Sequence, residues 1–339
     1  MALSPSWASA PACSPLVVLG LIPSSLSGRA AYLGYRLGAF GAQRVPRSLD
    51  EHLCKLFGRV FAARMSGRAA MIERHLRRVH GDELQGAALR SAVDAAFDSY
   101  ARYWLESFSL PRETPESLDA HFETVGLDHL DDALRAGKGA ILALPHLGAW
   151  DFGGAWLTTH GYPLTVVVEK LEPAELFEWF VEHRRSIGME VIPLDPRAGT
   201  VVVRALRAGH LVALLCDRDL TDSGVEVELF GERTTMPSGP ATLALRTGAP
   251  ILPTTAYFRP RGGHLGVVRP PIPVYRQGKL REDVARITQL LAYELEALIR
   301  EAPEQWHLMQ PNWPSDFEFI EELRKETQPG SQSAVGPDA

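Results

Sequence analysis

The sequence predicts an α/β protein with a mostly parallel central sheet flanked by helices, preceded by a helical region. From about residue 137 onward, short and continuous apolar runs alternate with amphipathic segments. Continuous apolar strands separated by helices are typical of a parallel sheet that is buried on both faces. Between positions 50 and 103 the chain instead has helical periodicity and few Gly or Pro residues.

The apolar runs and the segments between them give the elements in order. Strands are expected at residues 140–144, 164–168, 190–193, 211–216 and 250–257. Helices are expected between them, at 149–159, 174–186, 200–208 and 239–247. A last amphipathic helix is expected at 281–300, where apolar residues recur on one face.

The helical region at residues 29–110 has an excess of positive charge. Between positions 29 and 80, eleven Lys or Arg residues stand against three Asp or Glu, a balance of +8, although the whole chain has a net charge of −6. Apolar residues such as Leu53, Phe57 and Val60 recur at helical spacing among these basic residues. A second helical run, at 87–107, has aromatic residues that are expected in the core. The basic amphipathic pattern predicts association with an anionic membrane lipid surface.

Two other interpretations of this basic region stay open. It is either a solvated helix face, which needs no partner, or a nucleic-acid-binding surface. Nucleic acid ranks last, because the rest of the chain has a balance of −14 and contains no recognised nucleic-acid-binding motif. The sequence therefore predicts a lipid partner and no nucleic acid.

The two ends of the chain differ from the rest in composition. Residues 1–28 contain no charged side chain and are interrupted by Pro11, Pro15 and Pro23, so neither a cleaved signal nor a spanning helix is expected. The three cysteines lack metal-ligand spacing and predict no disulfide framework. The predicted organisation is a flexible segment at 1–28, a helical membrane-associating region at 29–110, an α/β catalytic region at 111–316 packed with it as one domain, and a helix end with a disordered tail at 317–339.

The most informative segment joins the first apolar strand to the next helix. Pro145 ends the strand, His146 follows at once, and Asp151 comes five residues later. Two helical residues five apart point about 140° away from each other. His146 and Asp151 can therefore meet only if His146 lies on the loop and Asp151 in the first helical turn. Gly148 gives the loop the freedom to turn back.

His146 and Asp151 suit a base and its orienting partner. An imidazole can take a proton from an acceptor hydroxyl near neutral pH, and a carboxylate holds the ring in one tautomer. No G-x-S-x-G segment occurs, which counts against a hydrolase. The alternative is a buried, hydrogen-bonded structural histidine. We expect His146 and Asp151 to be catalytic, without a metal.

Further charged residues lie at positions where substrate could bind. Glu169 and Asp217 each follow an apolar strand, and the carboxyl ends of parallel strands share one edge of a sheet. Both are expected to bind substrate, and the alternative is a solvated loop charge. Arg184 could neutralise a phosphate or a carboxylate, or could be a plain surface charge of a helix. Arg233 could likewise bind an anionic group of the substrate or be a plain surface charge.

With these residues the sequence resembles the bacterial lysophospholipid acyltransferase superfamily. Within it, the chain is most similar to the branch of the lipid A late acyltransferases and phosphatidylinositol mannoside acyltransferases. The resemblance covers roughly residues 29–316, in the family's order. The closing Trp-His-x-x-Gln-Pro-x-Trp and the Asp-Arg-Asp-Leu-Thr segments look closer to the actinobacterial mannoside branch. The matching segments are Ala-Leu-Pro-His146-x4-Asp151, Val-Glu169-Lys-Leu-Glu-Pro173, Arg184-Arg-Ser-Ile-Gly, Asp217-Arg-Asp-Leu-Thr, Phe230-Gly-Glu-Arg-Thr-Thr-Met-Pro-Ser-Gly, Thr247-Gly-Ala-Pro-Ile-Leu-Pro253 and Trp306-His-Leu-Met-Gln-Pro-Asn-Trp313.

The resemblance implies a reaction, a location and a set of groove residues. It implies transfer of a fatty acyl group from acyl-CoA, as co-substrate and with no other cofactor, to a mannose hydroxyl of a phosphatidylinositol mannoside, a glycolipid acceptor. It also implies peripheral attachment to the cytoplasmic face of the plasma membrane. By the same resemblance Glu169, Arg184 and Asp217 would line the active-site groove. The family often has Glu where this chain has Asp217, so contacts to the sugar there are expected to differ by one methylene.

Two other classes of function compete with an acyltransferase. Asp217-Arg-Asp219 is also a D-x-D after a buried strand, the arrangement by which sugar-nucleotide transferases hold a divalent cation. A metal-dependent glycosyltransferase acting on the same lipid is therefore the second interpretation, although it leaves His146 and Asp151 unexplained. The third is a membrane-binding module without catalysis. It does not account for polar residues at three strand ends.

Overall fold

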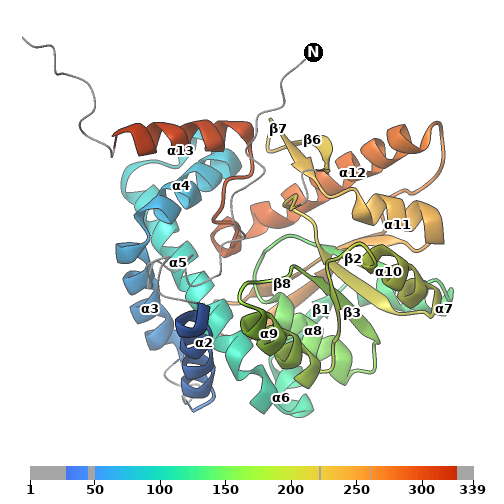
Figure 1. The fold of residues 1–339 in the computed structure, drawn as a ribbon, viewed down its shortest axis with the longest axis horizontal. Helices are drawn as coiled ribbons and strands as arrows, with labels where there is room; N and C mark the ends of the chain where they lie inside the picture. Colours follow the sequence, from blue (N-terminus) through green and yellow to red (C-terminus); the bar gives the residue numbers. More distant parts are fainter. Residues whose placement is uncertain (1–27, 45–49, 221–222, 261, 327–339) are drawn as a thin grey trace, which may run out of the picture.

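A computed structural model describes residues 28–44, 50–220, 223–260 and 262–326. Most of the segment predicted to be flexible at 1–28 and the tail predicted to be disordered lie outside these residues. Within them the prediction of a mostly parallel sheet flanked by helices is confirmed (Figure 1).

The central sheet has seven strands in the order β1-β9-β8-β2-β5-β3-β4. The five strands from β8 to β4 are parallel to one another, whereas β9 pairs antiparallel with β8 and parallel with β1. A separate antiparallel hairpin, β6–β7, lies apart from this sheet. The strands are β1 Phe122–Val125, β2 Ala140–Leu144, β3 Leu164–Val168, β4 Glu190–Pro193, β5 Leu211–Leu215, β6 Val225–Leu229, β7 Glu232–Met236, β8 Ile251–Phe258 and β9 His264–Val268.

Helices precede the sheet and connect its strands. All five predicted strands and all five predicted helices after residue 137 are present, within two residues at each end. The prediction missed the short strands β1, β6, β7 and β9, which lack a continuous apolar run. The helices are α2 Gly28–Ala42, α3 Asp50–Arg64, α4 Ser66–His80, α5 Gly86–Ser109, α6 Pro115–Ala120, α7 Leu127–Arg135, α8 Trp150–Thr159, α9 Ala174–Ser186, α10 Ala198–Arg207, α11 Gly239–Thr247, α12 Leu280–Glu301 and α13 Pro314–Glu326.

Strand β2 shows how the layers are built. All five of its residues are buried, and successive side chains point to opposite faces of the sheet. Ile141 and Ala143 pack with α10, α11 and α12, whereas Ala140, Leu142 and Leu144 pack with α7 and its neighbours. The sheet is therefore covered on both faces, which is why the strand is a continuous apolar run.

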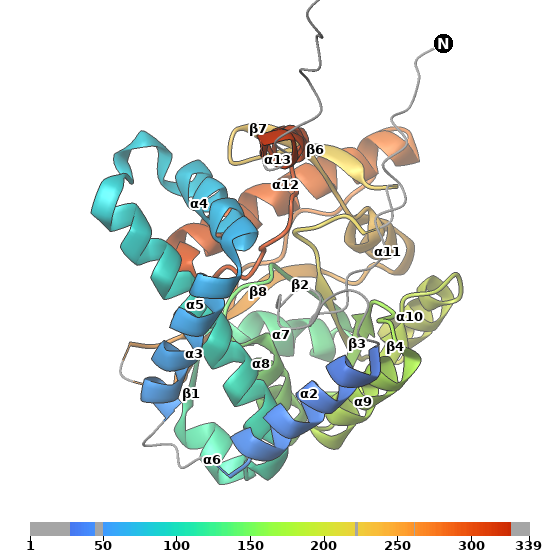
Figure 2. The ribbon, with the colours of Figure 1, turned by 60° about the vertical axis from the view of Figure 1, so that its left-hand side comes forward.

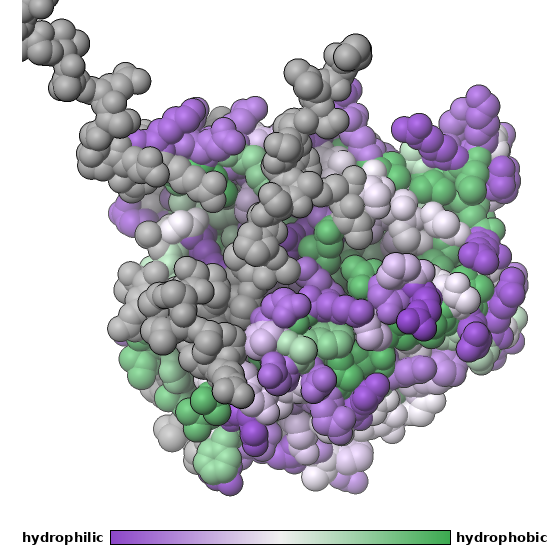
Figure 3. Space-filling model, viewed as in Figure 1, coloured by the Kyte–Doolittle hydropathy of each residue, from purple (hydrophilic) through white to green (hydrophobic). Residues whose placement is uncertain are grey.

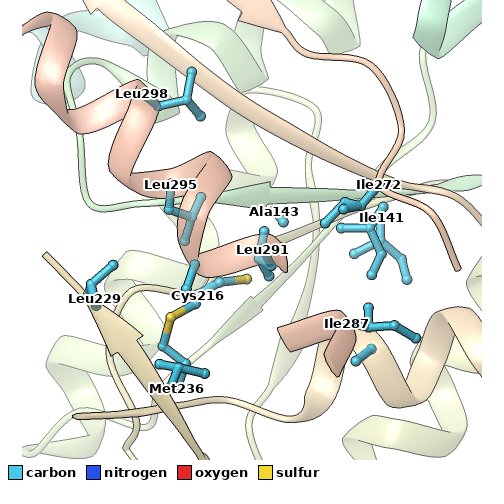
Figure 4. Close-up of a cluster of buried hydrophobic side chains, with 14 of the residues drawn as sticks. Ile141, Ala143, Cys216, Leu229, Met236, Ile272, Ile287, Leu291, Leu295 and Leu298 are labelled. Atoms are coloured by element: carbon cyan, nitrogen blue, oxygen red, sulfur yellow. The ribbon is translucent and has the colours of Figure 1, made fainter. Parts of the chain in front are cut away.

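The long helix α12 covers one face of the sheet. Its residues Ile287, Leu291 and Leu295 recur at helical spacing and are at most 1% exposed. Figure 4 shows these side chains directed toward Ile141 of β2 and Met236 of the hairpin. The apolar face of α12 thus holds the hairpin and the sheet together.

The N-terminal helices pack beside the sheet as a separate layer (Figures 1 and 2). Helix α5 packs against α2, α3 and α4, and it also contacts α8 next to the sheet. Its aromatic residues Phe97, Tyr100, Tyr103 and Phe108 are buried, at most 9% exposed, as predicted for core positions. Helix α5 therefore connects the basic helical region to the region that carries His146.

The outer surfaces of α2 and α3 have exposed apolar residues. On α2, Leu33, Leu37 and Phe40 are more than half exposed and recur at a spacing that places them on one face. On α3, Leu56 and Phe57 are exposed as well. Figure 3 shows hydrophobic side chains at the lower left of the molecule, where these two helices lie in Figure 1. In the described part of the chain, no helix is long and apolar enough to cross a bilayer.

The loop after β2 turns back at Gly148. This residue has φ +67°, and a Cβ atom placed on it would lie 2.1 Å from the Ala256 carbonyl oxygen. The close approach lets the Ala149 N–H donate to that same oxygen at 2.7 Å. The predicted role of Gly148 in turning the loop is confirmed by its positive φ and its close contact with β8.

Gly148→Ala should therefore destabilise the protein through both strain and a clash. A left-handed backbone costs a non-glycine residue about 1–2 kcal/mol, and the contact with Ala256 requires a shift of the loop in addition. Gly137→Ala is the matched control, because Gly137 has φ +69° with nothing within 4 Å of its added Cβ. Urea unfolding should show a clearly larger loss of unfolding free energy for Gly148→Ala. Equal losses in the two variants would contradict the clash.

Candidate active site

His146 and Asp217 lie at the carboxyl ends of two neighbouring strands. Strands β2 and β5 pair in parallel with Leu144 opposite Leu215, so His146 and Asp217 each come two residues after a paired leucine. The register continues past the strands, since the Cys216 N–H donates to the Leu144 carbonyl at 2.8 Å. The topology therefore brings the two side chains to the same level of the same sheet edge.

The carboxylate of Asp217 makes two bonds with His146. Its Oδ1 lies 2.7 Å from Nδ1 of the imidazole, and its Oδ2 accepts the His146 backbone N–H at 2.9 Å. Asp217 is 0% exposed, whereas the side chain of His146 is 29% exposed. The buried acid thus fixes a partly exposed histidine from both its ring and its backbone.

The charge state of Asp217 determines the tautomer of His146. Burial alone would raise the pKa of Asp217, but the charge of His146 and the hydrogen bonds from His146 and Trp306 outweigh it and hold this pKa below its ordinary value. An ionised carboxylate only accepts hydrogen bonds, so Nδ1 of His146 must donate. In the neutral imidazole Nε2 then carries a lone pair and can accept a proton.

The segment after α12 completes the surroundings of Asp217. Nε1 of Trp306 donates to Asp217 Oδ2 at 2.8 Å, and Nδ2 of Asn312 donates to the Asp217 carbonyl at 3.0 Å. The His307 N–H donates to the His146 carbonyl at 2.7 Å. The His307 ring is buried beside Ser99, and burial lowers its pKa to about 3, so it is neutral. All three residues belong to the matching Trp306–Trp313 segment, but nothing in the sequence predicted their contacts with the site.

The prediction that Asp151 orients His146 is corrected by the structure. Asp151 does lie in the first turn of α8, as expected, but its carboxylate accepts hydrogen bonds from Tyr103 at 2.8 Å and from Ser107 at 3.0 Å, both on α5. The Nδ1 atom of His146 is bonded to Asp217 instead. The chain leaves the sheet edge at Gly148, so the start of α8 faces α5 and α9.

Arg184 forms a buried ion pair with Asp151. Its Nε lies 3.1 Å from Oδ1 and its Nη2 lies 3.3 Å from Oδ2, and the two side chains are 17% and 4% exposed. Burial alone would raise the pKa of Asp151, but Arg184 and the hydrogen bond from Tyr103 hold it below its ordinary value. The Arg184 guanidinium is therefore paired with a carboxylate of the protein. Through Asp151 and Tyr103, this pair joins α8, α9 and α5.

The other predicted substrate-binding residues lie at different places. Glu169 follows β3 at the same sheet edge, half-buried, with β5 between its strand and that of His146. Asp217, predicted to contact sugar hydroxyls, is instead fully buried with both carboxylate oxygens bonded to the protein. Arg233 lies on the β6–β7 hairpin, where its side chain is 81% exposed and 3.4 Å from Glu226. The structure brings Arg233 into no contact with His146 among the described residues.

An apolar cavity of about 100 Å³ is lined by Leu144 and Trp150, two neighbours of His146, although His146 itself is not among its lining residues. It lies between α8 and the sheet, and Asp151 and Arg184 are part of its wall. Leu144, two residues before His146, lines it, and so does Trp150, whose ring meets the His146 ring edge-on at 5.8 Å. Its other apolar walls include Phe122, Leu142, Trp156, Leu157, Leu164, Val166, Val167, Val168, Met189, Leu214 and Leu215.

The two acids of the D-x-D motif are engaged separately. Asp217 is bonded to His146 and Trp306, and Oδ2 of Asp219 accepts the Gly224 N–H at 2.7 Å. Among the residues that the structure describes, no group of three His, Cys, Asp or Glu side chains could hold a metal ion. The geometry therefore gives the glycosyltransferase interpretation no particular support.

Known proteins resemble this chain over most of its length. A sequence model of the family described as bacterial lipid A biosynthesis acyltransferase matches residues 28–315. A phosphatidylinositol mannoside acyltransferase of Mycolicibacterium smegmatis is 38% identical over 305 residues, which cover 89% of this chain and 97% of that protein. The protein of the same name from Mycobacterium tuberculosis (strain CDC 1551 / Oshkosh) is 39% identical, over 87% and 92%. A lipid A biosynthesis acyltransferase of Haemophilus influenzae is 24% identical, over 63% and 66%.

Replacing Asp151 should cost stability, because the ion pair with Arg184 is buried. At about pH 7, Asp151→Asn should lower the free energy of unfolding by about 3–5 kcal/mol, since Arg184 is left as an uncompensated buried charge. The pKa of Asp151 is lowered in the folded state, so its contribution is present above about pH 4 and is lost as the pH falls further. The difference from wild type should therefore shrink toward about pH 3.

Urea unfolding across this pH range measures the effect. Asp128→Asn is the control, because Asp128 on α7 is 74% exposed and lies 3.9 Å from the ring of His129. A loss for Asp151→Asn no greater than that of the control would contradict a stabilising role for the ion pair.

Proposed function

Because the chain belongs to the bacterial lipid A biosynthesis acyltransferase family, we propose that it transfers a fatty acyl group from acyl-CoA to a sugar hydroxyl of a phosphatidylinositol mannoside. One observation supports this most directly. An ionised, buried Asp217 holds His146 with Nε2 free to accept a proton, next to an apolar cavity. A base beside a space for an acyl chain is what transfer of an acyl group to a hydroxyl requires.

In the proposed reaction His146 acts as the general base. Nε2 removes the proton from the acceptor hydroxyl as its oxygen forms a bond to the carbonyl carbon of the thioester. Asp217 stabilises the imidazolium that results, because its carboxylate already accepts the Nδ1–H at 2.7 Å. The tetrahedral intermediate then collapses, the carbon–sulfur bond breaks, and the imidazolium returns the proton to the leaving thiolate. The products are the ester and free coenzyme A.

Direct attack by the acceptor fits the absence of a suitable nucleophile in the described part of the chain. No hydroxyl or thiol of a described residue is hydrogen-bonded to the ring of His146. Cys216 lies next to Asp217 in sequence, but its thiol is 0% exposed, and burial raises its pKa. A neutral buried thiol is a poor nucleophile. An intermediate with the acyl group on the enzyme is therefore not part of the proposal.

The apolar cavity is proposed to hold the acyl chain. Its walls are made mostly of aliphatic and aromatic side chains, and each methylene group removed from water contributes about 0.8 kcal/mol. Leu144 and Trp150 connect the cavity to His146, so a chain lying in it would present its carbonyl end to the imidazole. Asp151 and Arg184 then stabilise the cavity wall rather than take part in proton transfer.

The acceptor is proposed to approach over the carboxyl edge of the sheet. Glu169 lies there, half-buried, and its carboxylate is suited to accept hydrogen bonds from sugar hydroxyls. A mannosylated lipid is proposed because two relatives at 38% and 39% identity have the name phosphatidylinositol mannoside acyltransferase. In this proposal Glu169 contacts the sugar, whereas Asp217 is buried and bonded to the protein.

A lipid acceptor implies a membrane surface, and α2 and α3 offer a face for one. Leu33, Leu37 and Phe40 project from α2 among the basic residues Arg36 and Arg44. Apolar side chains flanked by basic ones are typical of helices that lie in the interface of an anionic membrane. We propose peripheral attachment to the cytoplasmic face of the plasma membrane through these helices.

Acyl transfer should depend on both members of the His146–Asp217 pair. With labelled palmitoyl-CoA and a phosphatidylinositol mannoside, His146→Ala should lose about 10²- to 10⁴-fold in rate, the usual contribution of a general base. Asp217→Asn should reduce both acyl transfer and the hydrolysis of acyl-CoA by water, because the imidazole loses the partner of Nδ1. A residue that only bound sugar would affect transfer alone.

Asp219→Asn is the matched control, because Asp219 belongs to the same D-x-D motif but bonds to Gly224. It should retain most activity, and activity should persist in excess chelator. Activity of a folded His146→Ala protein close to that of wild type would refute the mechanism. Loss of activity in Asp219→Asn and in chelator would indicate that the D-x-D motif holds a metal ion, and a wild type without any acyl transfer would favour the glycosyltransferase.

Vesicle binding should depend on the exposed face of α2. Leu37, 70% exposed, should insert into the interface, so Leu37→Glu should weaken co-sedimentation with anionic vesicles. Leu280→Glu is the control, because Leu280 is 50% exposed at the start of α12, away from α2 in both ribbon views. Binding of the wild type should also fall as salt rises and as anionic lipid is removed. Equal effects of the two substitutions, or indifference to salt, would contradict this surface.

A further inference from the structure

Three N–H groups hold the carboxylate of Asp217. Two of them belong to His146, one from its ring and one from its backbone. The third is Nε1 of Trp306, 2.8 Å from Oδ2. Trp306 is thus the one side chain other than His146 itself that bonds this carboxylate within the described residues, and it comes from a segment about 90 residues away in sequence.

Trp306 is held in place by its own pairing with the His146 loop. Trp306 and Leu147 form an antiparallel bridge. On either side of it, the Gly148 N–H donates to the Gln305 carbonyl at 3.0 Å and the His307 N–H donates to the His146 carbonyl at 2.7 Å. The segment 305–307 therefore lies along the loop like a short extra strand, and the Trp306 side chain, 4% exposed, reaches Asp217.

The geometry points to Trp306 as a positioning residue: we propose that its indole N–H fixes the orientation of the Asp217 carboxylate, so that Oδ1 stays directed at Nδ1 of His146. The inference rests on the proposed role of His146 as a base, although the hydrogen bond that it concerns can be observed without any substrate. Trp306 itself touches neither the acyl chain nor the acceptor in this proposal.

The physical reason is that a carboxylate can rotate about its Cβ–Cγ bond. Without a donor on Oδ2 beyond the His146 backbone, the two oxygens of Asp217 are held less firmly, and Oδ1 aligns less well with Nδ1. The indole N–H also places the positive end of a dipole on the carboxylate and offsets part of its negative charge. Its removal leaves more negative potential at the imidazole and favours the protonated ring.

The chain that follows Trp306 is anchored on the basic helix α4 through Asp316. Asp316 is 0% exposed, and its Oδ1 accepts hydrogen bonds from Arg74 at 3.0 Å and from Arg78 at 2.6 Å. Its Oδ2 accepts the backbone N–H of Asn312 at 3.1 Å and lies 3.4 Å from Nε2 of His75. Trp306 is therefore held between two fixed points, the His146 loop and α4, which limits its freedom to move away from Asp217.

Trp306→Phe tests the inference, because it removes the N–H and keeps an aromatic ring. We expect kcat to fall by about ten- to 100-fold, the value of one hydrogen bond to a charged group. The acid limb of the pH profile of kcat/KM should move to higher pH, because the protonated imidazole is favoured. KM for acyl-CoA should stay nearly unchanged, since Trp306 does not line the cavity.

Trp313→Phe is the matched control. Trp313 is a fully buried tryptophan of the same segment, but its indole donates to the Leu229 carbonyl at 3.3 Å and not to Asp217. It should lower stability without moving the acid limb. Wild-type kcat and an unmoved limb in folded Trp306→Phe would overturn the inference. An equal movement of the limb in both variants would do the same.

Proton NMR gives a readout that needs no activity. The Nδ1–H of His146 should give a low-field resonance, assigned by its loss in His146→Ala. In Trp306→Phe this resonance should shift or broaden through exchange with water, and in Trp313→Phe it should stay in place. An unchanged resonance in Trp306→Phe would overturn the inference whether or not the protein transfers acyl groups. A shifted resonance in a protein without transferase activity would instead count against the proposed function alone.

Discussion

The arrangement of the site depends on one buried charge, the carboxylate of Asp217. It is 0% exposed, so it is stable as an anion only because N–H groups of His146 and Trp306 surround it. Each of these donors needs its own support from the fold. The parallel pairing of β2 and β5 brings His146 level with Asp217, and the segment after α12 brings Trp306. If the carboxylate were protonated or turned, Nδ1 of His146 would lose its acceptor and Nε2 would no longer be fixed as the basic nitrogen.

The site uses two buried acids for different tasks. Asp217 is bonded to an imidazole that reaches solvent, whereas Asp151 is bonded to Arg184 and Tyr103, which do not contact the imidazole of His146. The Asp151–Arg184 pair joins α8, α9 and α5 around the apolar cavity, so it supports the place where an acyl chain is proposed to lie. The same α5 helix packs against α2 and α3, which have exposed apolar residues. Helix α5 therefore connects the proposed lipid-facing helices mechanically to the wall of the cavity.

The sequence predicted the five parallel strands of the sheet and placed His146 at the end of one of them, but it was misleading about the partner of His146. Buried strands are recognisable because both faces are covered, which makes β2, β3, β4, β5 and β8 continuous apolar runs. The short strands β1, β6, β7 and β9 have no such signal.

Asp151 was predicted to be the partner of His146 because it is close to it in sequence. A spacing of five residues does not say in which direction the chain leaves the turn at Gly148. A signal for Asp217 did exist: it stands as far beyond its apolar run as His146 stands beyond its own. Strand order, which the sequence did not supply, decides that β5 and not β3 is the neighbour of β2. Trp306 depends on tertiary pairing of distant segments, which periodicity cannot reveal.

Because Asp217 is buried, the length of its side chain affects its contacts with the protein and not contacts with the sugar. The resemblance leads one to expect a glutamate at the position of Asp217. The shorter aspartate therefore predicted a change in the contacts to the sugar. In the structure Asp217 Oδ2 accepts the backbone N–H of His146 at 2.9 Å, so the carboxylate lies directly against the main chain of the loop. A side chain longer by one methylene needs more distance between the end of β5 and that loop. The loop is fixed on its other side by the Gly148 contact with Ala256 and by the pairing of Leu147 with Trp306. The length of the acid is therefore matched to the position of His146, and selectivity for the proposed sugar acceptor is expected to come from residues that reach solvent at the same edge, such as Glu169.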